Sequence, residues 1–367
     1  MRILHIDPDD VDNPLSGGGP RRTLEIYRRL SSRHEITVLT PTFEGSTPEK
    51  IRDGVRYVRL GRKVGDHGSS HHITFFFALP RAVRRFEYDL LVEDFMPPAS
   101  ITLSPLFTRR PHIASVQWFS AESLSRQYKL PFHLGERYGL RLYRYFVVLT
   151  EDMRRRIQQR HPAARCTCVP NGVAEELFGV PIRTGTFALF LGLVDFPIKG
   201  VDLLLRALAQ IPVEERVPLV LAGHGFQWDH VRALIDALDL TAWVAIVGRV
   251  GALERRRLFE QCRFVCVPSR EETFGLVILE SCAAGKPVVI FDRAPMNEVA
   301  PARACERAPA FDVAAYSQAM RRLIRASSAE LATRGAAARG WAERFSWDVL
   351  ARRQESFYEQ VVSGGVG

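Results

Sequence analysis

The chain has 367 residues, of which 46% are hydrophobic, so it can bury more than one core, and this length favours two domains over one. Its longest apolar stretches fall well short of the roughly 18–20 residues of a membrane-spanning helix, and its first residues lack the apolar region of a signal peptide, so we expect a cytoplasmic protein. The formal net charge of +9 favours anionic ligands, but no recognition motif accompanies the arginines, so we expect no nucleic-acid partner and favour a solvated arginine-rich surface over peripheral membrane contact.

The first half of the chain opens with an apolar segment at residues 2–6, which predicts a buried strand. A glycine-rich loop at residues 16–20 leads from this segment into a helical pattern over residues 23–30. Two further strands are expected at residues 89–92 and 112–116. Strands and helices that alternate in this way are typical of a parallel sheet with crossover helices.

The second half repeats this opening. A strand is predicted at residues 187–193, the loop after it leads into a helix over residues 201–209, and another strand is expected at residues 243–247. Glycines and prolines interrupt the patterns between residues 172 and 185, where we place the join between the halves. The sequence therefore predicts an α/β protein with two parallel-sheet domains.

The most informative segment lies between residues 264 and 284. Residues 264–267 are apolar and predict a buried strand, and residues 276–284 predict a helix. A helix that starts there directs free N–H groups and the positive end of its dipole to the carboxyl ends of the strands, where phosphates bind. Because Glu272 lies in the loop and Glu280 in the helix, one site offers phosphate donors with a carboxylate on either side.

No further strand is predicted after residue 289. Residues 314–325 and 330–345 have helical patterns, and a final helix is expected after residue 346. The six cysteines are scattered and lack a cluster of histidine or cysteine partners, so we expect reduced thiols and no metal site.

Glu272 and Glu280 resemble the E-x7-E signature of retaining glycosyltransferase family 4, whose members have two Rossmann-like domains facing a central cleft, the GT-B architecture. Other matching segments are residues 169–173, 199–204, 221–225 and 281–289. The resemblance implies two doubly wound parallel-sheet domains. The first would comprise residues 1–178 plus the C-terminal segment 346–367, and the second would comprise residues 179–345.

The resemblance also implies a site for a nucleotide-diphosphate sugar in the second domain. Lys199 would reach the β-phosphate, Glu280 would accept hydrogen bonds from the ribose hydroxyls, and Glu272 would contact the donor sugar. Lys199 and Glu272 are therefore the expected catalytic residues. The full set of expected donor-binding residues is Gly192, Lys199, Gly248, Arg249, Val250, Glu272, Thr273, Phe274, Gly275, Leu276 and Glu280. Without the flanking matches, Lys199 would be interpreted as a surface lysine and Glu280 as an ordinary helix residue.

The family resemblance implies no cofactor, no metal and no enzymic nucleophile, because the sugar nucleotide is a co-substrate and its departing phosphate is thought to take the acceptor's proton. Two positions depart from the family pattern. Leu193 stands where arginine is usual, so Lys199, the helix amides or another arginine such as Arg249 or Arg270 must neutralise the diphosphate. Gln117 stands where many members have histidine, and its amide can hydrogen-bond a hydroxyl but cannot act as an acid or base near neutral pH.

The first domain is expected to bind the acceptor. The expected residues there are Gly17, Gly18, Gly19, Asp94 and Gln117, although a glycine triplet suits a plain flexible turn equally well. The acidic residues that follow the predicted strands are Asp7, Asp9, Asp10, Asp12, Glu93 and Asp94. Acidic residues at such places often cap helices or are solvated in loops. A more specific hypothesis is that these residues attract an acceptor with amino groups.

The sequence therefore favours a retaining, metal-independent glycosyltransferase that uses a nucleotide-diphosphate sugar, with UDP preferred and GDP next, and a small acceptor. A lipid-linked or polysaccharide acceptor is an alternative. For a lipid-linked acceptor, the first-half arginines would share a face with exposed apolar residues among residues 75–77. Two further alternatives are a sugar-nucleotide epimerase of the same architecture and a non-catalytic sugar-nucleotide-binding protein, which Leu193 and Gln117 make conceivable.

Overall fold

The structure is a computed structural model, and it describes residues 1–14, 16, 18–62, 70–95, 103–118, 121, 125, 126, 129–225 and 227–364. The chain forms two compact units. The first consists of Met1–Gly172 and Trp347–Gly367, and the second consists of Val173–Ser346. The divisions thus fall after residue 172 rather than 178, and after residue 346 rather than 345. Val173 belongs to the second unit because its amide donates to the carbonyl of Phe345 at 3.2 Å.

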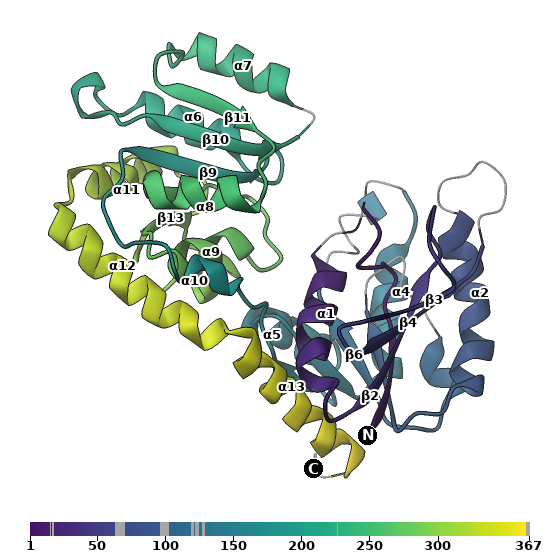
Figure 1. The fold of residues 1–367 in the computed structure, drawn as a ribbon. Coiled ribbons are helices and arrows are strands. Elements are labelled where there is room, and N and C mark those ends of the chain that lie inside the picture. Colours follow the sequence, from purple (N-terminus) through teal and green to yellow (C-terminus); the bar gives the residue numbers. More distant parts are fainter. Residues whose placement is uncertain are drawn as a thin grey trace. The chain divides into compact units, whose positions relative to one another are not determined.

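The first unit contains an eight-stranded sheet in the order β3-β4-β2-β1-β5-β6-β7-β8 (Figure 1). Its strands are β1 (Arg2–Ile6), β2 (Glu35–Pro41), β3 (Glu49–Arg52), β4 (Val55–Leu60), β5 (Leu90–Asp94), β6 (His112–Val116), β7 (Tyr145–Val148) and β8 (Arg165–Cys168). Among these strands only β3 and β4 pair antiparallel. Because β1 pairs with both β2 and β5, the residues that follow β1 and β5 leave the sheet side by side.

Helices cover both faces of this sheet. They are α1 (Gly19–Leu30), α2 (Ser70–Arg85), α4 (Phe132–Gly139), α5 (Glu151–Arg160) and α13 (Trp347–Val362), with the 3-10 turns η1 (Ser104–Phe107) and η2 (Leu140–Leu142). Successive side chains of β1 point to opposite faces, so Ile3 packs in one core with α1 and α13, whereas Leu4 and Ile6 pack in another with α2. The first unit is therefore doubly wound.

The second unit contains a six-stranded parallel sheet in the order β11-β10-β9-β12-β13-β14. Its strands are β9 (Phe187–Leu193), β10 (Leu219–His224), β11 (Val244–Gly248), β12 (Cys262–Val267), β13 (Val288–Phe291) and β14 (Cys305–Ala308). The expectation that no strand follows residue 289 was wrong. β14 has only four residues, two of them charged, and it pairs only with β13 at the sheet edge, so it has no apolar run to reveal it.

The helices of the second unit are α6 (Val201–Ala209), α7 (Trp228–Ala237), α8 (Ala252–Gln261), α9 (Leu276–Ala283), α10 (Met296–Val299), α11 (Val313–Arg325) and α12 (Ser328–Ala342), with the 3-10 turns η3 (Glu175–Leu177), η4 (Val213–Glu215) and η5 (Glu343–Phe345). The expected crossover helix after β9 is α6, with the predicted bounds. α9 follows β12 as predicted, which places Glu280 in this helix and Glu272 in the loop before it.

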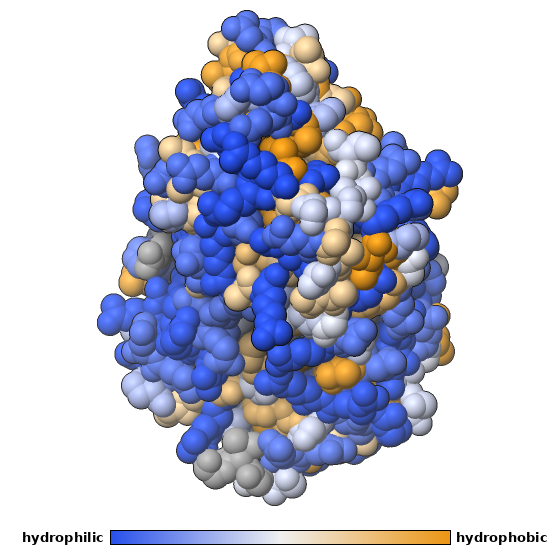
Figure 2. Space-filling view, turned by 90° about the vertical axis from the view of Figure 1, so that its left-hand side faces the viewer, coloured by the Kyte–Doolittle hydropathy of each residue, from blue (hydrophilic) through white to orange (hydrophobic). Residues whose placement is uncertain are grey.

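No helix within the described residues combines the length and the apolar character needed to cross a bilayer. Figure 2 shows one face of the protein, on which hydrophilic residues predominate and apolar residues form small separate groups.

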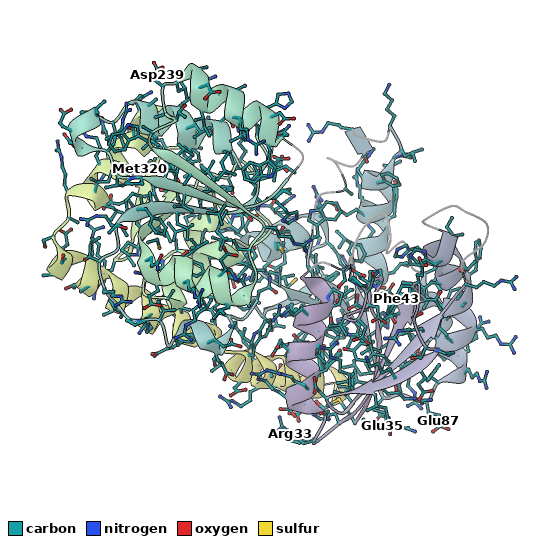
Figure 3. The ribbon with its side chains drawn as sticks, turned by 45° about the horizontal axis from the view of Figure 1, so that its top comes forward. Arg33, Glu35, Phe43, Glu87, Asp239 and Met320 are labelled. Carbon is teal, nitrogen blue, oxygen red and sulfur yellow. The ribbon has the colours of Figure 1, made fainter. Side chains whose placement is uncertain are left out.

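The C-terminal helix α13 completes the first unit, as the family resemblance implies. Tyr358 of α13 is fully buried in the core that contains Ile3. At the surface, Arg33 after α1, which is labelled in Figure 3, pairs with Glu355 at 2.7 Å. The indole ring of Trp347, the first residue of α13, packs against Gly172. A Cβ added to Gly172 would lie 2.4 Å from this ring, so residue 172 has no room for a side chain.

Candidate functional site

In the second unit, the loop between β9 and α6 lies against the ends of neighbouring strands. A Cβ on Gly223 would lie 1.7 Å from the carbonyl oxygen of Gly192, so only glycine fits at the end of β10. Gly200 precedes α6 with a φ of 64°, and a Cβ there would lie 2.3 Å from the carbonyl oxygen of Pro268. These close approaches bring Lys199 next to the loop that follows β12.

The N-terminus of α9 emerges from that same loop. Its N-cap, Gly275, has a φ of 94°, a conformation that strongly favours glycine. The amide of Ile278 donates to the carbonyl of Gly275 at 2.9 Å, so the amides of Leu276 and Val277 belong to the first helical turn, where no intrahelical acceptor exists. Thr273 and Phe274 lie immediately before this turn. The segment therefore has the geometry of an anion-binding helix end.

Lys199 and Glu272, the two expected catalytic residues, form an ion pair. The Nζ atom of Lys199 lies 2.6 Å from Oε1 of Glu272, and the hydroxyl of Ser269 donates to the same oxygen at 2.8 Å. Their side chains are 24% and 12% exposed, so the pair is shielded but still accessible. An ammonium, a carboxylate and a helix N-terminus thus come together at the carboxyl ends of β9 and β12.

Glu280 lies one turn further along α9, and its side chain is 13% exposed. Arg255 of α8 donates from Nη1 to Oε1 of Glu280 at 2.8 Å. A shielded carboxylate in an apolar helix needs a partner, and Arg255 supplies one for Glu280. Leu276 on the same helix is exposed, so α9 is not buried all round.

The arginines expected to replace the one missing at Leu193 have different surroundings. Arg270 forms a two-point ion pair with Asp202 at 2.7 and 2.8 Å and also donates to the carbonyl of Phe196. It therefore fixes the loop between β9 and α6. Arg249, by contrast, has an exposed side chain at the end of β11.

The remaining predicted donor residues are at the ends of strands. Gly192 in β9 and Gly248 in β11 have φ values of 154° and 80°. Val250 follows Gly248 and is partly buried. The structure thus places all the predicted donor residues in the second unit, at or after the carboxyl ends of β9, β11 and β12.

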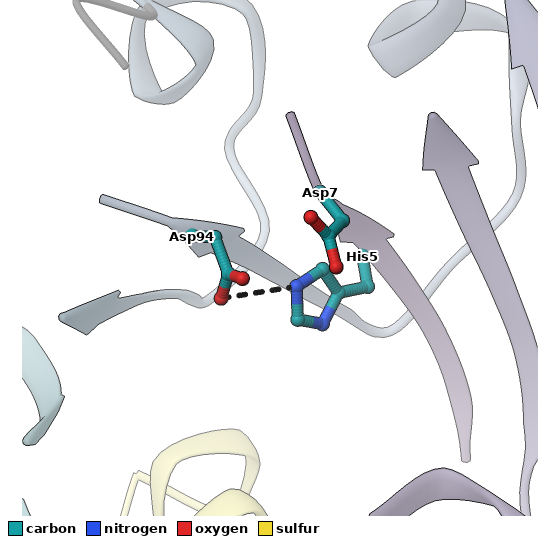
Figure 4. A group of neighbouring side chains, drawn as sticks. All are labelled: His5, Asp7 and Asp94. Carbon is teal, nitrogen blue, oxygen red and sulfur yellow. Dashed lines mark ion pairs between the residues drawn. The ribbon is translucent and has the colours of Figure 1, made fainter. Parts of the chain in front are cut away.

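In the first unit, a second cluster lies where β1, β5 and β6 end. The Nε2 atom of Gln117 donates to Oδ2 of Asp94 at 2.6 Å, and Oδ1 of Asp94 lies 3.3 Å from Nε2 of His5 (Figure 4). A Cβ on Gly19 would lie 3.2 Å from Oε1 of Gln117, so this glycine leaves room for the amide. The predicted residues Gly19, Asp94 and Gln117 therefore lie together, with His5 as an additional member.

Asp7 completes this cluster beside His5 (Figure 4). The hydroxyl of Thr23 and the amide of Asp9 donate to its two oxygens at 3.1 and 3.0 Å. Burial, and next the negative charge of Asp94, raise the pKa of Asp7 well above its usual value. The raised pKa thus reflects two buried carboxyl groups that repel each other when both are ionised.

A buried chain of hydrogen bonds links this cluster to α13. Nδ1 of His5 lies 2.6 Å from the hydroxyl of Tyr27, which lies 3.3 Å from the hydroxyl of Tyr358. Gln354 donates to Tyr358 at 2.6 Å. The chain fixes the imidazole of His5 from the side opposite Asp94.

The other acidic residues near these strand ends have partners within the protein. Arg59 pairs with Asp10 and Asp12, each at 2.8 Å. The hydroxyl of Tyr143 donates to Glu93, and burial raises the pKa of Glu93 to about 8. These contacts leave fewer charged carboxylates to attract an amino group than the sequence suggested.

Two groups among the described residues have the side chains of a metal site. His5, Asp7 and Asp94 have ligand atoms within 4.8 Å of one another, and His34, Glu355 and Glu359 form a second such group. In the first group Nε2 of His5 lies 3.3 Å from Oδ1 of Asp94, and in the second Nε2 of His34 lies 2.6 Å from Oε1 of Glu355. The absence of a metal therefore stays a prediction for both groups.

Of the glycine triplet, Gly17 lies outside the described residues, and Gly18 is the N-cap of α1 with an ordinary helical φ of −77°. Sequence reasoning did not single out His5, Ser269 or Arg255 as site residues. A polar residue inside an apolar strand was a usable signal for His5. Arg255 had no such signal, because it is the first of three consecutive arginines in a helix with many charged residues.

Each of the two parts of the chain matches a model of a known protein family. Residues 16–177 match the family model described as Glycosyltransferase Family 4, and residues 186–326 match the model described as Glycosyl transferases group 1. Together these models cover the candidate residues of both units, apart from those before residue 16.

Curated relatives and solved structures agree with these matches. The phosphatidyl-myo-inositol mannosyltransferase of Mycobacterium leprae is 28% identical over 390 residues, covering 100% of this chain and 98% of the relative. The D-inositol 3-phosphate glycosyltransferase of Mycobacterium avium is 30% identical over 222 residues, covering 55% of this chain and 51% of the relative. The sucrose-phosphate synthase of Thermosynechococcus elongatus has the same fold, with a TM-score of 0.79 at 19% identity, covering 99% of this chain and 100% of that one.

Proposed function

The chain belongs to glycosyltransferase family 4 and is a glycosyltransferase, and from this premise we propose that it transfers a hexosyl group from a nucleotide-diphosphate sugar to a hydroxyl, with retention of configuration and without a metal ion. The observation that carries this proposal is the ion pair of Lys199 with Glu272 beside the N-terminus of α9.

The proposed chemistry depends on stabilising the departing diphosphate. Negative charge grows on the β-phosphate as the bond to the sugar breaks. The Lys199 ammonium and the amides of Leu276 and Val277 supply positive charge and hydrogen-bond donors for it. Protein groups would thus do what a bound cation does in other phosphate sites, and this supports a metal-independent reaction.

Retention follows if the departing phosphate oxygen takes the proton of the acceptor hydroxyl. The new bond then forms on the face from which the phosphate leaves, and the reaction needs no nucleophilic side chain. Glu272 is assigned to a hydrogen bond with the donor sugar rather than to nucleophilic attack, because the bonds from Lys199 and Ser269 to its Oε1 atom lower the nucleophilicity of the carboxylate. Glu280 is assigned to the ribose hydroxyls, and the backbone at Gly248 and Val250 to the base. UDP is the preferred nucleotide and GDP the next.

For the acceptor we propose a polyol hydroxyl on an anionic lipid. The names of two relatives specify inositol acceptors, one of them a phosphatidyl lipid. Helix α2 supports a lipid surface, because Ile73 and Phe77 are 57% and 82% exposed, and Arg81 and Arg84 continue the same stripe at helical spacing. Exposed apolar side chains next to arginines are typical of helices that lie on anionic membranes.

A soluble acceptor with an amino group is the second candidate. The observation that favours it is Asp94, a buried carboxylate next to His5 at a strand end. An ammonium group is the natural partner for such a carboxylate. The pairing of Asp10 and Asp12 with Arg59 weighs against this candidate, because those carboxylates are already neutralised.

Calorimetric titration tests the donor site. We expect UDP or GDP, but not ADP or dTDP, to bind the wild-type protein, and we expect Lys199→Ala and Glu280→Ala each to weaken that binding about tenfold, the loss of a charged hydrogen bond. Arg257→Ala is the matched control, since Arg257 is an exposed cation on α8. The proposal is wrong if no nucleotide binds, or if both substitutions leave the affinity unchanged.

Product analysis tests the reaction and its acceptor. The protein is incubated with UDP-sugars and GDP-sugars in the presence of phosphatidylinositol vesicles, free inositol or an aminocyclitol, with and without EDTA. A lipid-linked product that keeps the donor's anomeric configuration and forms in EDTA is the expected result. Conversion of the donor without any acceptor identifies an epimerase, and donor binding without turnover identifies a non-catalytic protein.

Vesicle flotation tests the lipid surface separately. Phe77→Ser is expected to reduce binding to anionic vesicles severalfold, because it removes the most exposed apolar side chain of α2. Its nucleotide affinity should stay at the wild-type value. Leu253→Ser is a suitable control, since Leu253 is also exposed but lies on α8 of the second unit. Equal flotation of all three proteins would refute the assignment of α2.

A further inference from the structure

Three consecutive arginines in α8 have three different surroundings. Arg255 donates to Glu280 at 2.8 Å, Arg256 donates to the carbonyl of Gly179 at 3.0 Å, and Arg257 is exposed. Only Arg255 contacts a residue of the E-x7-E motif. The neighbouring arginines of α8 can therefore serve as controls in a test of what Arg255 does.

The side chain of Glu280 is only 13% exposed, so its carboxylate is shielded from water, and Arg255 supplies a charged partner. A shielded carboxylate without a charged or hydrogen-bonding partner is strongly disfavoured, and a glutamate side chain has several rotamers in which it would turn toward water instead. The planar guanidinium of Arg255 holds one carboxylate oxygen at a fixed point. The two side chains come from different helices, α8 and α9, so the contact also fixes the carboxylate relative to the end of β11, which immediately precedes α8.

A single oxygen of Glu280 can accept more than one hydrogen bond, since each carboxylate oxygen has two lone pairs. The bond from Arg255 therefore does not by itself use all the acceptor capacity of that oxygen. Arg255 is thus suited to orient Glu280 without competing with a ribose for it.

We propose that Arg255 is a positioning residue, which holds the carboxylate of Glu280 in the orientation that binds the ribose hydroxyls of the donor nucleotide. The inference rests on the proposed function, because it assigns the ribose to Glu280. It adds a residue outside the E-x7-E motif to the donor site. It also separates ribose recognition, which depends on Arg255, from diphosphate recognition, which depends on Lys199 and the end of α9.

The test compares nucleotides with and without ribose hydroxyls. Affinities for UDP and 2′,3′-dideoxy-UDP, and for the corresponding guanosine pair if GDP binds, are measured by calorimetry on the wild-type protein and on Arg255→Ala, Arg255→Lys, Arg257→Ala and Glu280→Ala. Arg255→Ala is expected to weaken binding of the ribonucleotide about tenfold and to leave the dideoxynucleotide within twofold. Arg255→Lys should restore part of the lost affinity, and Arg257→Ala should match the wild type.

A double variant completes the test. If Arg255 acts through Glu280, Arg255→Ala combined with Glu280→Ala should bind the ribonucleotide no more weakly than Glu280→Ala alone. Equal weakening of both nucleotides by Arg255→Ala overturns the inference, since it would show an effect on the diphosphate or the fold. Unchanged or tighter ribonucleotide binding overturns it as well.

The outcomes separate this inference from the proposed function. If no nucleotide binds, or if Glu280→Ala does not alter the preference for ribose, the donor site itself is wrong. If Glu280→Ala removes the preference and Arg255→Ala does not, the donor site stands and only the role of Arg255 is refuted.

Discussion

Glu93 offers a quantitative test of the electrostatics in the first unit. Its side chain is buried against Tyr143, and burial raises its pKa from 4.5 to about 8, although hydrogen bonds from Tyr143 and Ser104 oppose the rise. The folded protein therefore holds the proton more tightly than the unfolded chain does. The resulting stabilisation is fully present below pH 4.5 and is lost as the pH rises through 8. At about 1.4 kcal/mol per pKa unit, the shift amounts to about 4–5 kcal/mol, and relaxation of the site reduces the expected value to about 2–4 kcal/mol.

The substitution that isolates this effect is Glu93→Gln. The amide cannot ionise, but its oxygen still accepts the hydrogen bond from Tyr143. Urea denaturation of the first unit should give similar free energies of unfolding for variant and wild type near pH 5, and a variant that is about 2–4 kcal/mol more stable near pH 8.5. Glu44→Gln, at an exposed glutamate of the same unit, is the control. A difference between Glu93→Gln and wild type that is the same at both pH values would refute the reasoning.

Four further predictions concern single positions. Gly223→Ala should lower the free energy of unfolding of the second unit by about 2–4 kcal/mol in urea titrations, because the added methyl group overlaps the carbonyl of Gly192; a loss below about 1 kcal/mol would contradict this. Thr150→Ala should cost about 1 kcal/mol in the same assay, since Thr150 caps α5 by accepting from the amide of Met153 at 3.2 Å. Asp94→Asn should lower acceptor-dependent turnover at least about tenfold while nucleotide affinity stays unchanged, because it weakens the contacts with His5 and Gln117; equal losses in both measurements would argue against an acceptor role. Lys199→Ala should weaken binding of UDP but not of uridine, a comparison that calorimetry makes directly.

Most of the fold was accessible from the sequence because each unit repeats one simple pattern. β9 and α6 have the predicted bounds, since an apolar strand, a loop with glycine and an amphipathic helix follow one another there. The antiparallel pairing of β3 with β4 was not predicted, although Asp53 and Gly54 between the two strands carry the signal of a tight hairpin turn. Both residues have positive φ values, 49° and 79°. β14 lacked even that signal, because a short charged edge strand is defined only by its neighbour β13.

The site was less accessible than the fold, for a physical reason. A motif identifies which residues carry charge, but the partner of each charge is set by packing between distant segments. Lys199 and Glu272 are 73 positions apart, and Arg255 and Glu280 are 25 apart. Neither ion pair follows from periodicity or composition. The same holds for Arg270, which was expected to be available for the diphosphate but is bound to Asp202.

On the proposed function, the two ion pairs would explain how a donor site can hold two carboxylates and still bind an anion. Lys199 pairs with Glu272 and Arg255 pairs with Glu280, so each motif glutamate has a cation beside it that offsets its repulsion of a diphosphate. The positive end of α9 adds to this balance. On the proposed function, a bound diphosphate would give Lys199 a more highly charged partner than Glu272, and Glu272 would gain acceptor capacity for the sugar. Glu280 would make no such exchange, because ribose hydroxyls are neutral donors that would add to the bond from Arg255. We therefore expect Lys199 to change partner when the donor binds and Arg255 to keep its partner.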